Sequence, residues 1–191
     1  MIDHDADLVA RMRAGDESAF AELVRRYQPR LLRLARTMVP STAIAEEVVQ
    51  ETWLGVVRGV DKFEGRSSFK TWLYRILANR ARSAGGREQR AGLPAGDVVE
   101  RFDRSGAWAE PPEPWADRVD DRLLADKVAA RLVDLMGELP AAQREVVMLR
   151  DVEGLPAADV AAVVGVSDVH QRVLLHRGRA RLRQLLTAEM A

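Results

Sequence analysis

The chain has 191 residues, of which 47% are hydrophobic and 5% aromatic, and its 29 basic residues balance 29 acidic ones to a formal net charge of +0. This composition favours all-α globular domains, because Ala, Leu and Arg are good helix formers and strand-rich chains need more aromatic and β-branched residues. The absence of cysteine excludes disulfides, thiolate metal sites and cysteine nucleophiles. Since we find neither a signal peptide nor an apolar run long enough to span a membrane, we expect a cytoplasmic protein.

The first part of the chain predicts four helices with short links, which is typical of a compact bundle. Asp16 can cap a helix that ends near Pro29, and a second helix ends by Pro40. Ser41 or Thr42 can cap the third helix. The apolar residues that define the faces of these three helices are Phe20, Leu23, Val24, Tyr27, Leu31, Leu32, Leu34, Ala35, Ile44, Val48, Thr52, Val56 and Val60.

The third helix carries an unusual second face. Glu47, Gln50, Glu51 and Leu54 follow one another at helical spacing, opposite the apolar stripe. Such a face is most often simply solvated. The alternative is a docking surface for a basic partner, in which the leucine is the apolar anchor and the acids set the register.

The fourth helix follows the turn Glu64-Gly65-Arg66-Ser67-Ser68 and mixes aromatic with basic residues. Its spacing places Phe69 and Trp72 in the core rather than on a base-stacking surface, although stacking remains the alternative. At the edge of this apolar face lies a polar stripe. With the hydroxyls and backbone N–H groups of the turn, the stripe would suit contacts to phosphates or base edges. It consists of Thr71, Arg75, Asn79 and Arg82.

A stretch rich in Gly and Pro predicts a linker between two domains. We expect the first domain to span residues 1–83, the linker residues 84–119, and the second domain residues 120–191.

The second domain ends in a pattern typical of a helix-turn-helix. One helix carries Leu124, Val128, Leu132, Leu135 and Met136, and Pro140 opens the next, with Val146, Val147, Leu149 and Val152. Pro156 then starts a short helix with Val160, Ala161 and Val164 inward, Gly165 supplies a left-handed turn residue, and Ser167 caps the last helix.

The last helix has two distinct faces. One is apolar and holds Leu174, Leu175, Gly178, Leu182 and Leu185. The other lacks acids and is typical of a helix that reads a DNA groove; it holds Val169, Arg172, Val173, His176, Arg177 and Ala180. Gln171 falls on the apolar face, where we expect at most a hydrogen bond to a backbone carbonyl. His170 and His176 have no further candidate ligands, so we expect no metal site and no cofactor.

The segments AEEVVQETWLGVVRGVDKFEGRSSFKTWLYRILANRARS and LPAAQREVVMLRDVEGLPAADVAAVVGVSDVHQRVLLHRGRARLRQLL resemble the two domains of an extracytoplasmic-function (group 4) RNA polymerase sigma factor. The resemblance implies a non-catalytic alternative sigma factor that partners core RNA polymerase, promoter DNA and an anti-sigma factor. Domain 2 of this family binds the clamp coiled coil of the largest subunit and opens the minus-ten element. Domain 4 lies on the β-flap and reads the minus-thirty-five duplex.

The resemblance also implies roles for single residues. Glu47, Gln50, Glu51 and Leu54 would bind polymerase. The minus-ten contacts would come from Arg66, Ser67, Ser68, Lys70, Arg75, Asn79 and Arg82, and the minus-thirty-five contacts from Ser167, Val169, Arg172, Val173, His176 and Arg177.

The sequence departs from the family pattern in the last helix, where a Ser-Arg pair is usual at Val173 and Leu174, and a Val at Gln171. An apolar Val173 would favour a thymine methyl group. A dimeric helix-turn-helix repressor is the alternative function, but it leaves the acidic face of the third helix without a role. An enzyme would need a phosphate loop or a nucleophile beside a base, and we find neither.

Overall fold

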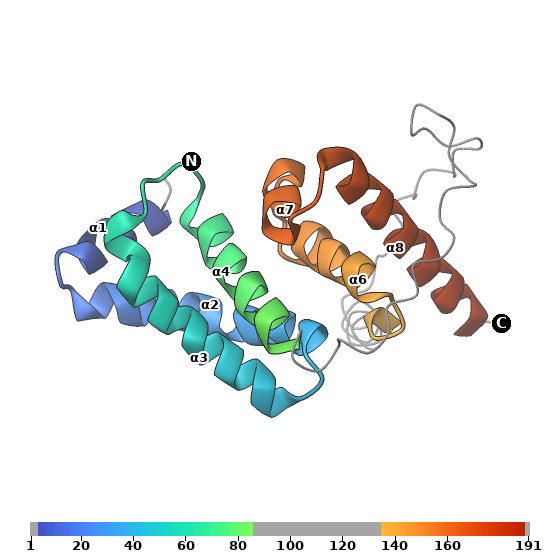
Figure 1. Cartoon of the computed structure of the whole chain (residues 1–191), viewed down its shortest axis with the longest axis horizontal. Coiled ribbons are helices and arrows are strands. Elements are labelled where there is room, and N and C mark those ends of the chain that lie inside the picture. The colour runs from blue at the N-terminus through green and yellow to red at the C-terminus, as the bar shows by residue number, and fades with distance from the viewer. Residues whose placement is uncertain (1–3, 86–134, 190–191) are drawn as a thin grey trace, which may run out of the picture.

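The computed structural model describes residues 4–85 and 135–189, and within these ranges it contains helices and turns and no strand. Helices α1 to α4 form one group and helices α6 to α8 a second group beside it (Figure 1). The predicted linker, apart from residues 84 and 85, lies outside the described residues. The all-α prediction and the helix-turn-helix are confirmed.

The prediction that one helix ends near Pro29 and another follows it is wrong, because α2 (Glu17–Met38) continues through this residue. It is one helix of 22 residues with Pro29 inside it, capped by the Asp16 carboxylate, which accepts from the backbone N–H of Ser18. Proline has no N–H, so Pro29 cannot donate the helical hydrogen bond to the carbonyl oxygen of Arg25. Both residues are exposed, so the missing bond lies on the solvent side of the helix. The buried stripe meanwhile continues through the proline at helical spacing, from Leu23 and Tyr27 through Leu31, Leu34 and Ala35.

Helix α1 (His4–Arg13) was not foreseen from the sequence. It buries Leu8 and Val9 against the bundle, and the Tyr27 hydroxyl donates a hydrogen bond to Asp5. The desolvation of Tyr27, together with this bond, raises the pKa of its phenol. The first domain is therefore a four-helix bundle, but the helices are α1 to α4 rather than the four we predicted.

Helix α3 (Thr42–Gly59) begins with Ser41, whose hydroxyl accepts from the N–H of Ile44 at 3.2 Å, so Ser41 and not Thr42 is the cap. The short helix η1 (Val60–Lys62) follows it. The predicted stripe is confirmed, with Ile44 partly buried and its other members fully buried: Val48, Thr52, Val56 and Val60.

Helix α4 (Phe69–Gly85) begins where the Ser68 hydroxyl accepts from the N–H of Thr71 at 3.1 Å. Phe69 is buried, which confirms its place in the core. Trp72 is only half-buried and stacks on Phe63 with ring centroids 4.9 Å apart. The prediction that both residues lie in the core is therefore confirmed for Phe69 and only partly for Trp72, which is half-buried.

The predicted helix with Leu124, Val128 and Leu132 lies outside the described residues, apart from its end at the buried Leu135 and Met136. Helix α6 (Ala141–Val147) follows and continues as the π-helical turn η2 (Met148–Val152). Helix α7 (Ala157–Val164) ends at Gly165, whose φ of 80° lies in the left-handed region that favours glycine. The Ser167 hydroxyl then accepts from the N–H of His170 at 3.2 Å at the start of α8 (Asp168–Glu189). Val152, which the sequence grouped with the apolar residues of this helix, is 41% exposed.

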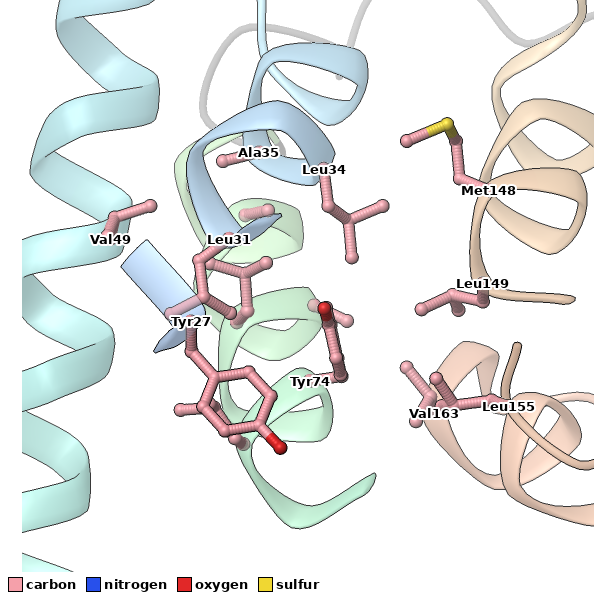
Figure 2. Packing of buried hydrophobic residues seen from close by; sticks show 14 of the residues in the cluster. Tyr27, Leu31, Leu34, Ala35, Val49, Tyr74, Met148, Leu149, Leu155 and Val163 are labelled. Atoms are coloured by element: carbon pink, nitrogen blue, oxygen red, sulfur yellow. The ribbon is translucent and has the colours of Figure 1, made fainter. Parts of the chain in front are cut away.

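The two groups of helices share one apolar core. Figure 2 shows Leu34 and Tyr74 of the first group facing side chains of the second group, and all of these residues are buried. The contact is made where α4 packs on α7 and α2 packs on α6. The facing residues of the second group are Met148, Leu149, Leu155 and Val163.

Candidate functional site

The acidic face of α3 points into solvent. Glu47, Gln50 and Glu51 are exposed, and Leu54 is 54% exposed although it is a large apolar residue. Val57, one turn further along, is 50% exposed and was not identified from the sequence. Its spacing of three residues from Leu54 could have revealed it. Exposed apolar residues beside acids on one helix face are suited to a partner that is both apolar and basic.

The loop before α4 is open to solvent. Gly65 has a φ of 70°, and the side chain of Arg66 is 84% exposed and pairs with Glu64. Ser67 and Ser68 lie between this turn and the helix, and the Ser68 and Thr71 hydroxyls are 2.8 Å apart. The loop thus presents hydroxyls and a cation at the start of α4.

The predicted polar stripe of α4 is divided in the structure. Arg75 is exposed. Arg82 instead reaches the second group of helices, donating to the backbone oxygens of Val163 at 2.8 Å and Val164 at 3.0 Å. It also donates to the Asn79 side chain at 3.1 Å, so Asn79 is held beside the same contact.

A buried carboxylate stands at the centre of the contact between the two groups. The side chain of Glu153 is 1% exposed and accepts from the Tyr74 hydroxyl at 2.5 Å and from Arg33 at 3.1 Å. Lys70 lies 3.9 Å from the same carboxylate and donates to the Glu153 backbone oxygen. Burial lowers the pKa of Lys70, and Glu153 opposes that shift.

Tyr74 and Glu153 were both missed by sequence reasoning. Tyr74 is fully buried, and burial together with its hydrogen bond to Glu153 raises the pKa of its phenol. Nearby, the Thr71 hydroxyl donates to Asp159 of α7 at 2.8 Å. No local pattern marks these pairs, because their members lie 79 and 88 residues apart in the chain.

The groove-reading face of α8 is exposed at its start and half-buried further along. Val169 is 58% exposed and Arg172 is exposed, whereas Val173, His176 and Arg177 are half-buried. Burial lowers the pKa of His176, and the nearby Arg183 and Arg179 lower it further, so that the neutral imidazole is favoured.

Two further residues of α8 make contacts within the second group of helices. Arg179 pairs with Asp151 within the same group of helices, at 2.5 and 2.9 Å. Gln171 is 1% exposed and its Nε2 has no hydrogen-bond partner among the described residues, so the expected bond to a backbone carbonyl is wrong. The side chain is held by the apolar packing between α8 and its neighbours.

The described residues contain no group of three or more His, Cys, Asp or Glu side chains that could hold a metal ion. Among the helices described, none combines the length and the apolar character needed to cross a membrane.

Comparison with known families matches residues 23–91 to Sigma-70 region 2 and residues 129–182 to Sigma-70, region 4. The chain is 34% identical over 182 residues to the ECF RNA polymerase sigma-E factor of Escherichia coli, covering 91% of this chain and 90% of the relative. It is 32% identical over 180 residues to the RNA polymerase sigma-H factor of Pseudomonas aeruginosa, covering 92% and 91%.

Two solved structures are similar over most of both chains. CnrH, in complex with the cytosolic domain of CnrY, has a TM-score of 0.64 at 27% identity, covering 96% of this chain and 97% of that one. The sigma factor RpoE from Bartonella quintana, in complex with the anti-sigma factor NepR, has a TM-score of 0.61 at 26% identity, covering 88% and 96%.

Proposed function

The chain belongs to the extracytoplasmic-function RNA polymerase sigma factors, which makes it an alternative sigma factor for transcription initiation, and we propose which of its surfaces perform each step. The observation that carries the proposal is the open face of α3, where Leu54 and Val57 are exposed beside Glu47, Gln50 and Glu51. The relatives span both domains, which disfavours the alternative of a stand-alone repressor.

The acidic face of α3 docks on the clamp coiled coil of the largest polymerase subunit. Leu54 and Val57 supply apolar area for the centre of the contact. Glu47, Gln50 and Glu51 supply acceptors that select basic residues across it. Glu51 is held by Arg80 at 3.4 Å, which positions one acid before the partner arrives.

The loop and α4 read the minus-ten element. Arg66, Ser67 and Ser68 are available to an unpaired base, and Arg75 to the backbone. Lys70, Asn79 and Arg82 complete this surface once the second domain has moved away from them.

The start of α8 reads the minus-thirty-five duplex. Val169 and Arg172 are the most accessible of the predicted residues, and Ser167 fixes the end of the helix that enters the groove. Val173, His176 and Arg177 lie beside them. A neutral His176 can both donate and accept, which suits a base edge better than a phosphate.

We further infer a cytoplasmic protein without catalytic activity of its own that an anti-sigma factor holds inactive. The support is that the similar CnrH and RpoE structures contain CnrY and an anti-sigma factor, respectively.

Charge reversal of the docking face tests the proposal. Glu51→Arg places a cation against the basic partner surface, so the affinity for core polymerase should fall by about 100-fold or more, since like charges in a contact cost several kcal/mol. The measurement is competition between labelled wild type and each variant for core polymerase. Folding should be unchanged because Glu51 is exposed.

Glu138→Arg is the matched control, because it makes the same charge change at an exposed residue of the second domain. It should bind like wild type. Wild-type affinity for Glu51→Arg would show that α3 is not the docking face.

A further inference from the structure

Helix α1 lies outside the stretch that matches Sigma-70 region 2, which begins at residue 23, yet its last residue reaches the loop before α4 (residues 64–68). Arg13 donates one hydrogen bond to the backbone oxygen of Val60 at 2.8 Å and another to the backbone oxygen of Phe63. Its guanidinium also lies over the Phe63 ring, with Cζ 6.0 Å from the ring centroid. The contacts of one side chain therefore converge on the residue where η1 ends and the loop begins.

The loop is anchored at both of its ends. At the far end, the Ser68 hydroxyl accepts from the N–H of Thr71, which is a local contact between residues three apart. At the near end, Arg13 and Phe63 are 50 residues apart in the chain, so this contact ties the loop to another helix. Between the two anchors, the side chain of Arg66 is 84% exposed. The path of the loop therefore depends on where Arg13 holds its first residue.

The Phe63 ring connects this anchor to the start of α4. It lies against Trp72 with ring centroids 4.9 Å apart, and it meets Phe69 edge-on at 6.3 Å. Phe69 is buried in the core, whereas Phe63 and Trp72 are half-buried. Phe63 is thus held by a cation from α1 and by two aromatic rings of α4, and together these contacts set the direction in which the chain enters the loop.

The contacts of Arg13 bear on the position of the loop more than on the stability of the bundle. Arg13 is exposed, and α1 is also held by the buried Leu8 and Val9 and by the ion pair of Asp5 with Arg26 at 2.6 Å. A guanidinium presents its N–H donors in a fixed fork, so it can fix two carbonyl oxygens relative to each other. Loss of Arg13 should therefore loosen the loop and leave α1 in place.

We propose that Arg13 is a positioning residue for recognition of the minus-ten element, because it fixes Phe63 and so keeps the loop in the geometry that receives an unpaired base. The proposal rests on the proposed function for the role of the loop. A loop that is already ordered loses less freedom when the correct base enters, and it adapts less readily to a wrong one. Arg13 contacts backbone oxygens and a ring of its own chain, so it acts through the loop.

Arg13→Met tests the ordering of the loop, because it keeps an unbranched side chain and removes the charge and the donors. The chain has no cysteine, so a single spin label can be placed at Arg66→Cys in the loop. The label should be more mobile when Arg13→Met is added. Asp5→Asn is the matched control, because it removes the charge from a different contact of α1, its ion pair with Arg26 of α2. The mobility of the label should then remain that of the parent chain.

A second measurement tests the link to recognition, in chains that carry no label. Reconstituted holoenzyme transcribes a panel of promoters that differ by one base in the minus-ten element. At the position that the loop reads, the preference for the best base over the others should fall about 10-fold in Arg13→Met, less in Arg13→Lys, and not at all in Asp5→Asn. Thermal unfolding should be unchanged in Arg13→Met, because Arg13 is exposed.

An unchanged mobility of the label in Arg13→Met overturns the positioning role. A more mobile label with unchanged base preference, or an equal loss of transcription at every promoter of the panel, overturns the link between Arg13 and recognition. If Ser67→Ala and Arg66→Ala leave base preference as in wild type, the proposed function of the loop is rejected instead, and the mobility measurement still decides whether Arg13 orders it.

Discussion

Glu145 is a buried carboxyl group whose charge state should set the pH dependence of stability. It lies on α6 with 9% of its surface exposed, and it pairs with Arg82 at 3.4 Å. Burial raises the pKa of this carboxyl group from 4.5 to about 7, and Arg82 opposes the shift. The folded chain therefore holds a proton here at pH values where the unfolded chain has lost it.

The free energy of unfolding should consequently fall as pH rises. The contribution of Glu145 is complete below pH 4.5 and is lost as pH passes through about 7, and the loss is roughly 3 kcal/mol. Glu145→Gln mimics the protonated acid and should not show this loss. Urea unfolding of both proteins from about pH 4.5 to pH 8 should give similar stabilities at the acid end and a more stable variant at the alkaline end.

Glu138→Gln controls for the loss of a carboxyl group, because Glu138 is exposed. Its difference from wild type should be small and independent of pH. A constant difference for Glu145→Gln across the same range would contradict the raised pKa.

At the scale of elements, α6 and α8 approach each other closely at Gly178. A Cβ atom at this position would lie 2.6 Å from Cγ2 of Val147 and 3.4 Å from the backbone oxygen of Gln143. The first distance is well inside van der Waals contact, and Val147 is itself buried. Glycine here serves the packing of two helices, since the position is an ordinary helical one within α8.

Gly178→Ala should therefore destabilise the chain, although alanine is the better helix former. Overpacking costs about 1 to 3 kcal/mol, which exceeds the gain of about 1 kcal/mol in helix propensity. Urea unfolding measures the change, and Gln184→Ala at an exposed position of α8 should stay within about 0.5 kcal/mol of wild type. Adding Val147→Ala should relieve part of the loss in Gly178→Ala, and a more stable Gly178→Ala would rule out the close contact.

The elements were predictable where the local pattern decides the structure. The cap at Ser41, the turn at Gly165 and the buried stripe of α3 follow from side-chain chemistry and helical spacing alone. The predicted break at Pro29 was wrong because the tertiary packing of α2 continues on both sides of an exposed proline.

The candidate surfaces were predictable in part for the same reason. The acids and Leu54 of α3 share a face at helical spacing, so the sequence alone brings them together. The Glu153 cluster could not be foreseen, because it joins α2 and α4 to a segment of the second domain. Gln171 lies on the predicted apolar face and is buried there, but the unpaired state of its amide nitrogen depends on the packed neighbours.

At the scale of the whole molecule, the balance of charge limits what the free chain can bind. Basic and acidic residues are equal in number, so the net charge gives little long-range attraction to DNA. Two cations that could meet phosphates are already engaged, Arg179 by Asp151 and Arg82 by the carbonyl oxygens of α7. The isolated chain should therefore depend on polymerase to bring it to a promoter.

This dependence should be visible in the effect of salt on binding to promoter duplex. Each phosphate neutralised adds about 0.9 to the slope of log affinity against log salt, so a chain whose basic residues are balanced by as many acidic ones should bind weakly and with a slope smaller in magnitude than about 3. Fluorescence anisotropy of a labelled duplex between about 50 and 200 mM salt measures the slope for free chain and holoenzyme. The holoenzyme should bind more tightly and with the steeper slope, because polymerase adds its own phosphate contacts. Tight binding by the free chain, with a slope as steep as that of the holoenzyme, would show that the balance of charge does not limit its binding to DNA.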